Sequence, residues 1–263
     1  MPVFEDDFAF LSDKWVKIGD RPNFTVKAED GWLKIKFDWI IPPETPHYLG
    51  RRYIPYNAGG VCYKEPIDLT NRRVVAKFDM NPKTVTPCYA GLFFYCGGLM
   101  IGNKVLPEGA SLISDPDFKG VLVLYGYLSC IPFESVYYKI TGYSYSPWAG
   151  RFNAKVPPTE LSMEVTPSLI RLYETDFPVG EFEPPFDISK SYIYLLSPQT
   201  AEASTQSGRV LGPEELSFDY VKVENLPPPP ITPVINTMLY TAIAMSVLIS
   251  NTTLLIRAVR LVR

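Results

Sequence analysis

The stretch FTVKAEDGWLKIKFDW, residues 24–39, decides the fold class. On either side of Glu29, Asp30 and Gly31, apolar and polar residues alternate with the period of a half-buried β-strand. An Asp-Gly pair between two alternating runs is a strong signal for a tight hairpin turn. The stretch therefore predicts a β-hairpin with its turn at residues 29–31.

Further alternating or apolar runs follow along the chain, and none has a helical period. Aromatic residues make up 14% of the sequence and proline occurs 26 times, which favours strands and proline-interrupted loops. We predict an all-β domain over residues 1–225, an antiparallel jelly-roll sandwich. Its further strands are expected at residues 73–80, 88–96, 120–130, 161–166 with 169–174 as a second hairpin, 191–196 and 216–224.

The C-terminal end of the chain has a different character. Residues 226–233, LPPPPITP, form a proline-rich spacer that favours an extended polyproline conformation. Residues 234–256 contain no charged side chain and, at about 1.5 Å per helical residue, have the length to cross a bilayer core about 30 Å thick. We predict one C-terminal transmembrane helix there. Ala242, Ser246 and Ser250 recur every four residues within it, a pattern of small residues that allows close helix packing.

A basic tail, residues 257–263, follows the predicted span. Arg257, Arg260 and Arg263 are expected to contact lipid headgroups, so the lipid bilayer is a predicted partner. The positive-inside rule places this tail in the cytoplasm and the large domain outside. The N-terminal MPVFEDDFAF, in contrast, lacks the basic region and apolar core of a signal peptide, which favours a cytosolic domain. Both a cell surface and a virion membrane stay open as the location.

Charge and cysteine content exclude several classes of function. The net charge is −3 and His47 is the only histidine, so neither nucleic-acid binding nor a zinc site is expected. The cysteines Cys62, Cys88, Cys96 and Cys130 have no CxxC spacing. We interpret them as buried small hydrophobic residues, with one or two disulfides as the alternative.

Several segments, in their order along the chain, resemble a known superfamily. They are DDFAFL near the N-terminus with a later Trp, GWLKIKF, AGLFFYCGG, the hairpin LSMEVTPSLIRLYE, and FDYVKVEN as the last strand. Together they look like a concanavalin A-like lectin/glucanase jelly roll, a superfamily that includes laminin-G-like modules and laminarinase-type glucanases. The resemblance covers roughly residues 4–225 and implies that the first and last strands lie close together.

The resemblance also bears on catalysis. The glucanase branch uses paired carboxylates in an E-x-D-x-x-E strand, and the sequence contains no such string. The nearest pairs are Glu160 with Glu164, in the predicted hairpin, and Glu181 with Glu183, in a proline-rich loop. We therefore predict that the protein is not an enzyme and requires no cofactor.

A structural calcium ion is a further implication of the resemblance. Members of the superfamily often hold it between acids near the N-terminus and an acid of the last strand, where this chain has Glu5, Asp6, Asp7 and Asp219. The alternative is that Asp6 and Asp7 are solvated turn residues and Asp219 points outward. The acids of SDPDFKG, residues 114–120, are interpreted as a turn.

A glycan site needs exposed aromatic rings with polar neighbours. The richest loop of this kind is GYSYSPWAGRFN, residues 142–153. The alternative is that its aromatic side chains cover the core or a neighbouring subunit. The candidate sugar-binding residues are Tyr143, Tyr145, Trp148, Arg151 and Asn153, with Trp39 as a further option.

Two functions from different classes follow. The first is a non-enzymatic, membrane-anchored surface or virion structural protein that displays a lectin-like jelly roll for assembly or attachment, as a homo-oligomer or in a larger assembly. The second is a membrane-tethered carbohydrate-binding module with a glycan partner. An anchored glycoside hydrolase is a weaker alternative because the acid pair is missing.

Overall fold

The computed structural model divides the chain into two compact units, Met1–Leu226 and Pro227–Arg263. It describes residues 2–19, 24–37, 57–80, 93–110, 115–128, 131–142, 144–148, 158–199 and 215–227. Apart from residues 226 and 227, the predicted spacer, membrane span and basic tail lie outside these ranges, with Ala242, Ser246, Ser250, Arg257, Arg260 and Arg263. In the described part of the chain, no helix is long and apolar enough to cross a membrane.

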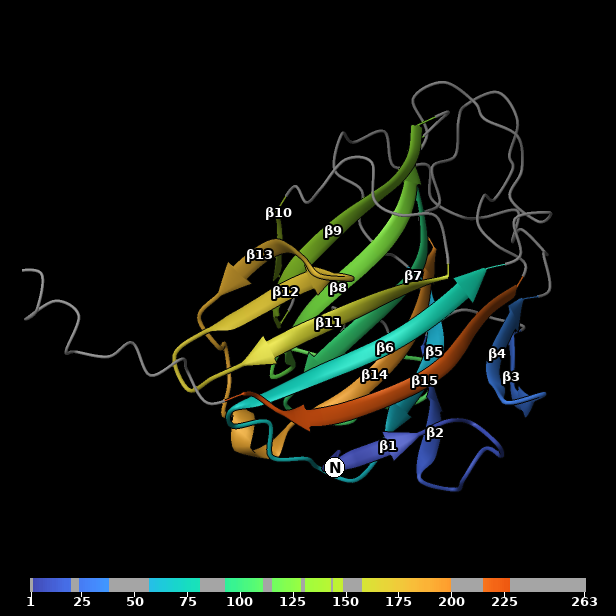
Figure 1. Ribbon diagram of the computed structural model, residues 1–263, viewed down its shortest axis with the longest axis horizontal. Helices are drawn as coiled ribbons and strands as arrows, with labels where there is room; N and C mark the ends of the chain where they lie inside the picture. Colours follow the sequence, from blue (N-terminus) through green and yellow to red (C-terminus); the bar gives the residue numbers. More distant parts are fainter. Residues whose placement is uncertain are drawn as a thin grey trace, which may run out of the picture. The chain divides into compact units, whose positions relative to one another are not determined.

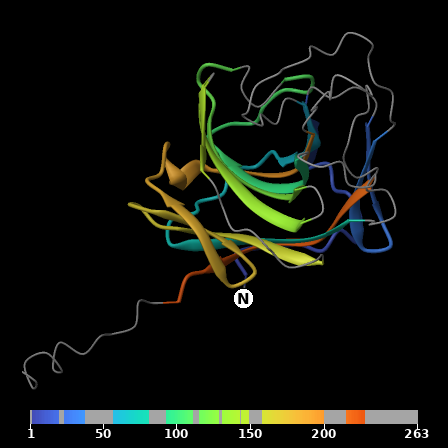
Figure 2. The ribbon, with the colours of Figure 1, turned by 90° about the horizontal axis from the view of Figure 1, so that it is seen from above.

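The first unit consists of two antiparallel β-sheets packed face to face (Figures 1 and 2). Sheet A has eight strands, and β1 (Phe4–Asp6) pairs with its strand β15. From edge to edge, the other strands of sheet A are β13 (Phe177–Phe182), β12 (Ile170–Glu174), β11 (Thr159–Val165), β6 (Arg72–Met80), β15 (Glu215–Asn225), β4 (Trp32–Phe37) and β3 (Phe24–Glu29).

Sheet B has seven strands and is strongly curved (Figure 2). A single turn of 3-10 helix, η2 (Ile188–Lys190), precedes its strand β14 in the described residues, and the Asp187 side chain caps this turn by accepting from Ser189 N. The order of sheet B is β10 (Ser144–Trp148), β9 (Ile131–Thr141), β8 (Lys119–Leu128), β7 (Phe93–Gly102), β14 (Tyr192–Gln199), β5 (Asn57–Tyr63) and β2 (Trp15–Ile18).

The first and last strands lie side by side, as the resemblance implied. Phe4 of β1 is opposite Val223 of β15, and Val3 N donates to Val223 O at 2.7 Å. Just beyond β15, Leu226 N donates to Asn71 O at 3.1 Å. The point at which the chain leaves the sandwich is therefore held by backbone hydrogen bonds.

The main core fills the space between the two sheets. The Phe78 ring of sheet A meets the Tyr125 ring of sheet B edge to face, with centroids 5.0 Å apart. Alternate residues of each strand point into this core, the pattern expected for an antiparallel sandwich. They include Leu33, Ile35, Val74, Ala76, Leu161, Met163, Leu172, Phe218, Val221 and Val223 of sheet A, and Val61, Leu99, Ile101, Val121, Val123, Ile193 and Leu195 of sheet B.

Both predicted hairpins are confirmed. Between β3 and β4, Asp30 and Gly31 have φ of +56° and +74°, the left-handed geometry that a two-residue hairpin turn needs. Between β11 and β12, Val165 pairs with Ile170 and Leu161 with Glu174. An antiparallel β-sandwich is thus the observed fold of the described residues of the first unit.

One strand prediction needs correction. The strand expected at residues 88–96 was placed to end before Gly97 and Gly98, whereas β7 continues through both glycines to Gly102. Glycine suits these two strand positions because side chains of neighbouring strands occupy the space where a Cβ atom would lie. At Gly97, for example, a Cβ would be 3.1 Å from a Leu216 methyl carbon. Strands β1, β2, β5, β9, β10 and β13 were not predicted.

These close approaches make two glycines a matched test. A Cβ at Gly60 would collide with the backbone carbonyl oxygen of Leu195, which cannot move without breaking the sheet. At Gly97 it would meet only side chains, and its nearest contacts are the two Leu216 methyl carbons at 3.1 and 3.2 Å. We expect Gly60→Ala to lower the free energy of unfolding by about 3 kcal/mol and Gly97→Ala by about 1 kcal/mol. Urea unfolding followed by circular dichroism measures both. Equal losses in the two variants would contradict this account.

Candidate functional site

Sheet B has apolar side chains on both faces. Along β8, Val121 and Val123 point into the main core, and Leu122, between them, points to the opposite face. The side chains of that second face form a cluster of their own, which we call the outer cluster, and no member is more than 2% exposed. Its members are Ile18, Cys62, Met100, Leu106, Phe118, Leu122, Leu124, Ile140, Tyr194 and Leu196.

The connection between β7 and β8 supplies part of the cover over this face. Its described parts, residues 103–110 and 115–118, contribute Leu106 and Phe118. Phe118 comes so close to the two strands that a Cβ at Gly102 would be 2.9 Å from its ring, and one at Gly120 would be 3.2 Å away. Glycine at these two positions therefore makes room for the aromatic ring.

A buried tyrosine ties this connection to the sheet. The Tyr194 hydroxyl, on β14, donates to Lys104 O and accepts from Leu106 N at 3.1 Å. Its ring meets the Phe118 ring edge to face at a centroid distance of 6.0 Å. Burial raises the pKa of Tyr194 far above its ordinary value, so the hydroxyl stays protonated and can donate.

Cys62 lies in the same cluster as a free, fully buried thiol. Burial raises its pKa to about 12, so it is neutral and unreactive at ordinary pH. The interpretation of this cysteine as a small hydrophobic residue is confirmed. Cys88 and Cys130 lie outside the described residues, as does the side chain of Cys96.

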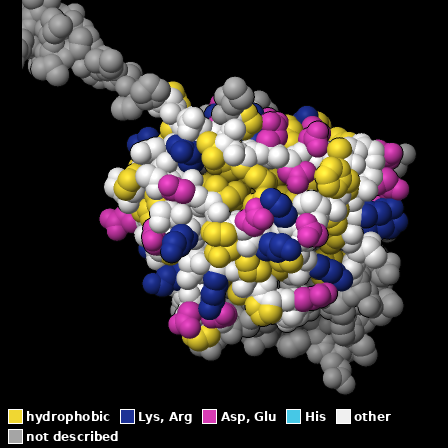
Figure 3. All heavy atoms as spheres, turned by 90° about the horizontal axis from the view of Figure 1, so that it is seen from below, with side chains coloured by type: hydrophobic (Ala, Val, Ile, Leu, Met, Phe, Trp, Pro, Cys, Tyr) yellow, Lys and Arg dark blue, Asp and Glu magenta, His cyan; other side chains and the backbone are white. Residues whose placement is uncertain are grey.

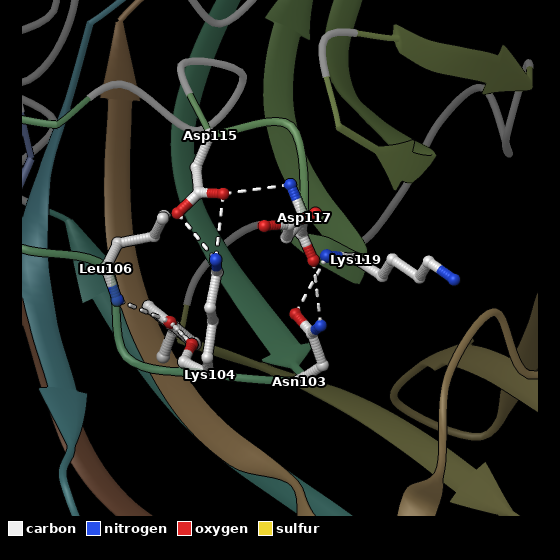
Figure 4. A network of polar contacts seen from close by, with 7 residues as sticks. Asn103, Lys104, Leu106, Asp115, Asp117 and Lys119 are labelled. Atoms are coloured by element: carbon white, nitrogen blue, oxygen red, sulfur yellow. Dashed lines mark hydrogen bonds and ion pairs between the residues drawn. The ribbon is translucent and has the colours of Figure 1, made fainter.

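Polar contacts close the base of the connection (Figure 4). Lys104 Nζ lies 2.8 and 2.7 Å from the two carboxylate oxygens of Asp115, and Asp117 N donates to the same carboxylate at 2.9 Å. Asn103 Nδ2 donates to Asp117 O at 2.9 Å, and Lys119 N donates to Asn103 Oδ1 at 2.8 Å. Asp115 and Asp117 thus form the predicted turn. Lys104, which follows β7, binds this turn through its ion pair with Asp115.

The carboxylate pairs nearest to a hydrolytic motif are held in other contacts. Glu160 and Glu164 lie on β11, four residues apart, which corresponds to about 13 Å along a strand. Tyr220 donates to Glu160, and Tyr173 donates to Glu164 at 2.8 Å. Both carboxylates of this pair are therefore engaged by tyrosine hydroxyls. Of the other pair, Glu181 lies 3.6 Å from Arg171.

The four predicted calcium ligands are not gathered into one site. Asp6 accepts from Phe8 N at 2.9 Å and from Trp15 Nε1 at 2.7 Å, and Asp219 pairs with Lys77 at 2.7 Å. The remaining two are Glu5, which lies opposite Lys222 in the β1–β15 register, and Asp7. Among the described residues, no three His, Cys, Asp or Glu side chains are grouped to hold a metal ion. This arrangement does not fit a calcium ion, and calcium binding stays an untested prediction.

The predicted sugar-binding loop forms part of a hairpin at one edge of sheet B. Tyr145 and Trp148 lie on β10, where Tyr145 is opposite Ile140 and Trp148 is opposite Tyr137 of β9. Positions three apart on a regular strand belong to opposite faces, so the register does not favour a single platform made of both. The remaining candidates, Tyr143, Arg151, Asn153 and Trp39, lie outside the described residues, as do the side chains of β10.

Comparisons with known proteins agree on the fold alone. No family model matches the sequence, and no curated protein matches it. Among solved structures, a laminarinase from Flavobacterium sp. UMI-01 matches with 14% identity over 85% of this chain and all of the other, at a TM-score of 0.53. A galectin-like protein of unknown function from Bacillus subtilis matches with 9% identity over 85% of this chain and 96% of the other, also at 0.53.

A non-specific endo-β-1,3(4)-glucanase from family GH16 gives 15% identity over 85% of this chain and 90% of the other, at a TM-score of 0.51. The chain has the concanavalin A-like jelly-roll fold. At these identities the likeness extends to the architecture of the two sheets.

The outer cluster was not predicted from the sequence, nor was Tyr194, which binds the β7–β8 connection to the sheet. The available signal was GVLVLYGYL in β8, a continuous apolar run instead of an alternating one, which is typical of a strand buried on both faces. Nothing in the local sequence of β14 marks Tyr194, because its partners lie about 90 residues earlier in the chain.

The ion pair between Lys104 and Asp115 predicts that the stability of the domain depends on pH. Lys104 holds the pKa of Asp115 below its ordinary value of 3.8, so the stability that this ion pair contributes is present above that pH and is lost as the pH falls through the lowered pKa. We expect Asp115→Asn to lower the melting temperature at neutral pH, and the difference from the wild type to disappear in strong acid. Asp117→Asn is the control, because the backbone of Asp117 makes the contacts described above. A difference that persists in acid would contradict the assignment.

Proposed function

We propose that the protein is a non-enzymatic, membrane-anchored structural protein that displays a concanavalin A-like jelly roll at a cell or virion surface, for assembly or attachment. The observation that carries the proposal is the outer cluster. A hydrolase of this fold needs two carboxylates that face an open cleft. In this chain, ten side chains of the outer cluster are buried, Val16 and Tyr192 beside them are partly buried, and the chain's own β7–β8 connection packs over part of the cluster.

The state of the described carboxylates supports the same proposal. Glu160 and Glu164 are bound by tyrosine hydroxyls, and Asp115 is bound by a lysine. Burial and the bond to Glu160 raise the pKa of Tyr220, so this tyrosine keeps its proton and remains a donor. These acids serve to hold strands and loops together.

The membrane part of the proposal rests on the sequence after residue 226. An uncharged run at residues 234–256, behind a proline spacer and before three arginines, has the composition of a single anchor. The spacer begins where β15 ends, at a backbone hydrogen bond between Leu226 and Asn71. The domain would therefore be tethered from a fixed point of sheet A.

Deletion of residues 227–263 tests the anchor. We expect the full-length chain to stay with membranes after alkaline carbonate extraction and to float with them in a density gradient, because an inserted helix is released only by detergent. The truncated chain, which ends at the boundary of the first compact unit, should move to the supernatant with an unchanged β-sheet spectrum.

Extraction of the full-length chain by carbonate would contradict the anchor. Turnover of laminarin by the purified full-length chain, if abolished by a single carboxylate substitution, would contradict the non-enzymatic role.

A second candidate function is carbohydrate binding. The observations that favour it are the lectin-like and glucanase-like fold and an edge hairpin that carries Tyr145 and Trp148 on β10. An aromatic ring at an edge position is able to stack on the face of a sugar. The glycan would then be the attachment partner of the displayed domain.

A glycan array with the full-length chain tests this candidate. If it is correct, a restricted set of glycans binds, and Trp148→Ala weakens their binding about tenfold or more through loss of the stacking surface. Trp32→Ala is the matched control, since Trp32 lies on β4 of the other sheet. Absence of binding, or equal weakening by both substitutions, would remove carbohydrate recognition by this hairpin.

A further inference from the structure

The connection between β1 and β2, residues 7–14, presents an aromatic side chain to solvent. Phe10 is 72% exposed, more than any other large hydrophobic residue that the structure describes. Its neighbour Phe8 is fully buried in the main core. Large aromatic side chains are enriched among the residues that contribute most to binding at protein interfaces.

This connection, which we call the Phe10 loop, is fixed at both ends by one carboxylate. Asp6 Oδ1 accepts from Phe8 N at 2.9 Å, and Asp6 Oδ2 accepts from Trp15 Nε1 at 2.7 Å. Trp15 N donates to Ser12 O at 3.2 Å, which closes the far end. These bonds restrain both ends of the loop, and such restraint lowers the entropy cost of association.

The backbone at Phe8 is strained. Its φ is +54°, in the left-handed region that a bulky residue rarely adopts. Packing of the Phe8 ring against the Trp15 indole, at a centroid distance of 5.7 Å, holds it there. With this backbone conformation, the Phe8 side chain lies in the main core and the Phe10 side chain is exposed to solvent. Strain of this kind persists only where the surroundings enforce it, and it is common where a segment is shaped for binding.

The Phe10 loop contains two acidic side chains and one basic side chain, Lys14. Asp7 and Asp13 are exposed on the two sides of Phe10 in the loop. The two nearest lysines in the sequence are engaged elsewhere, Lys14 with Glu65 at 3.0 Å and Lys17 with Glu108 at 3.6 Å. A complementary partner would offer an apolar pocket with basic side chains at its rim.

Two other occupants fit less well. An anionic lipid surface would repel the aspartates that flank Phe10. A second copy of this chain would have to supply the basic rim, but the chain has a net charge of −3. On the face seen in Figure 3, the described acidic and basic side chains are interspersed and form no basic block.

We propose that the Phe10 loop is a docking element for a different protein that has an apolar pocket rimmed by lysine or arginine side chains. Phe10 fills the pocket, and Asp7 and Asp13 meet the rim. The inference goes beyond the proposed function, because it depends neither on the membrane anchor nor on glycan binding.

The test selects ligands with the full-length chain reconstituted with phosphatidylcholine. A phage-displayed library of random peptides is panned on this preparation, with phosphatidylcholine alone as background. We expect the enriched peptides to combine lysine or arginine with large apolar residues. Phe10→Ser should weaken the binding of a selected peptide about tenfold or more. Phe177→Ser is the matched control, because Phe177 is also exposed, at 48%, but lies on β13.

A second variant separates charge from shape. The double substitution Asp7→Asn with Asp13→Asn should slow association and reduce its salt dependence, while Phe10 remains in place. Thermal unfolding of each variant reports whether the fold is intact. The proposal is overturned by selected peptides without basic residues, by no enrichment, or by equal effects of Phe10→Ser and Phe177→Ser. It is also overturned if Phe10→Ser dissociates a homo-oligomer or releases the chain from phosphatidylserine vesicles, since the occupant is then a second copy or a lipid surface.

Discussion

Burial of both faces of sheet B is the constraint on which the rest of the structure depends. The outer face of sheet A carries ion pairs such as Lys77 with Asp219, beside the buried Val75 and Ser162. The outer face of sheet B carries leucine, methionine and tyrosine side chains that have to be removed from water. The chain covers part of it with the β7–β8 connection. This cover requires glycine beside the Phe118 ring. It also requires two backbone partners for the Tyr194 hydroxyl, because a buried hydroxyl without a hydrogen bond is strongly unfavourable.

If the proposed non-enzymatic role is correct, this constraint separates the domain from an enzyme built on a similar frame. A sheet that performs hydrolysis has to leave charged side chains open to substrate and water, and each such side chain weakens the packing of its neighbours. Here the described part of that face is used for stability, and the exposed features lie at the periphery, in the edge strand β10 and in the Phe10 loop. The interactions of the domain are therefore expected to involve its rim.

Local structure could be predicted well from the sequence. Contacts between segments that are distant in the sequence could not. The hairpin turn at Asp30 and Gly31 is encoded by adjacent residues, and it was predicted correctly. The extent of β7 was not, since Gly97 and Gly98 look like a break unless Leu216 and Leu124 are known to pack against them. The bond from the Trp15 indole to Asp6 was not predicted, because it depends on how β1 and β2 are placed in three dimensions.

The position of β15 has a consequence for how the domain forms. β15 is the last strand in sequence but lies between β6 and β4 inside sheet A, and it also holds β1. Until residues 215–225 have been synthesised, the three strands β1, β4 and β6 of that sheet lack a neighbour, and the main core lacks Phe218, Val221 and Val223. Pairings between such distant segments form slowly, and open strand edges attract other chains. Folding of this domain therefore cannot be completed during translation before residue 225 leaves the ribosome.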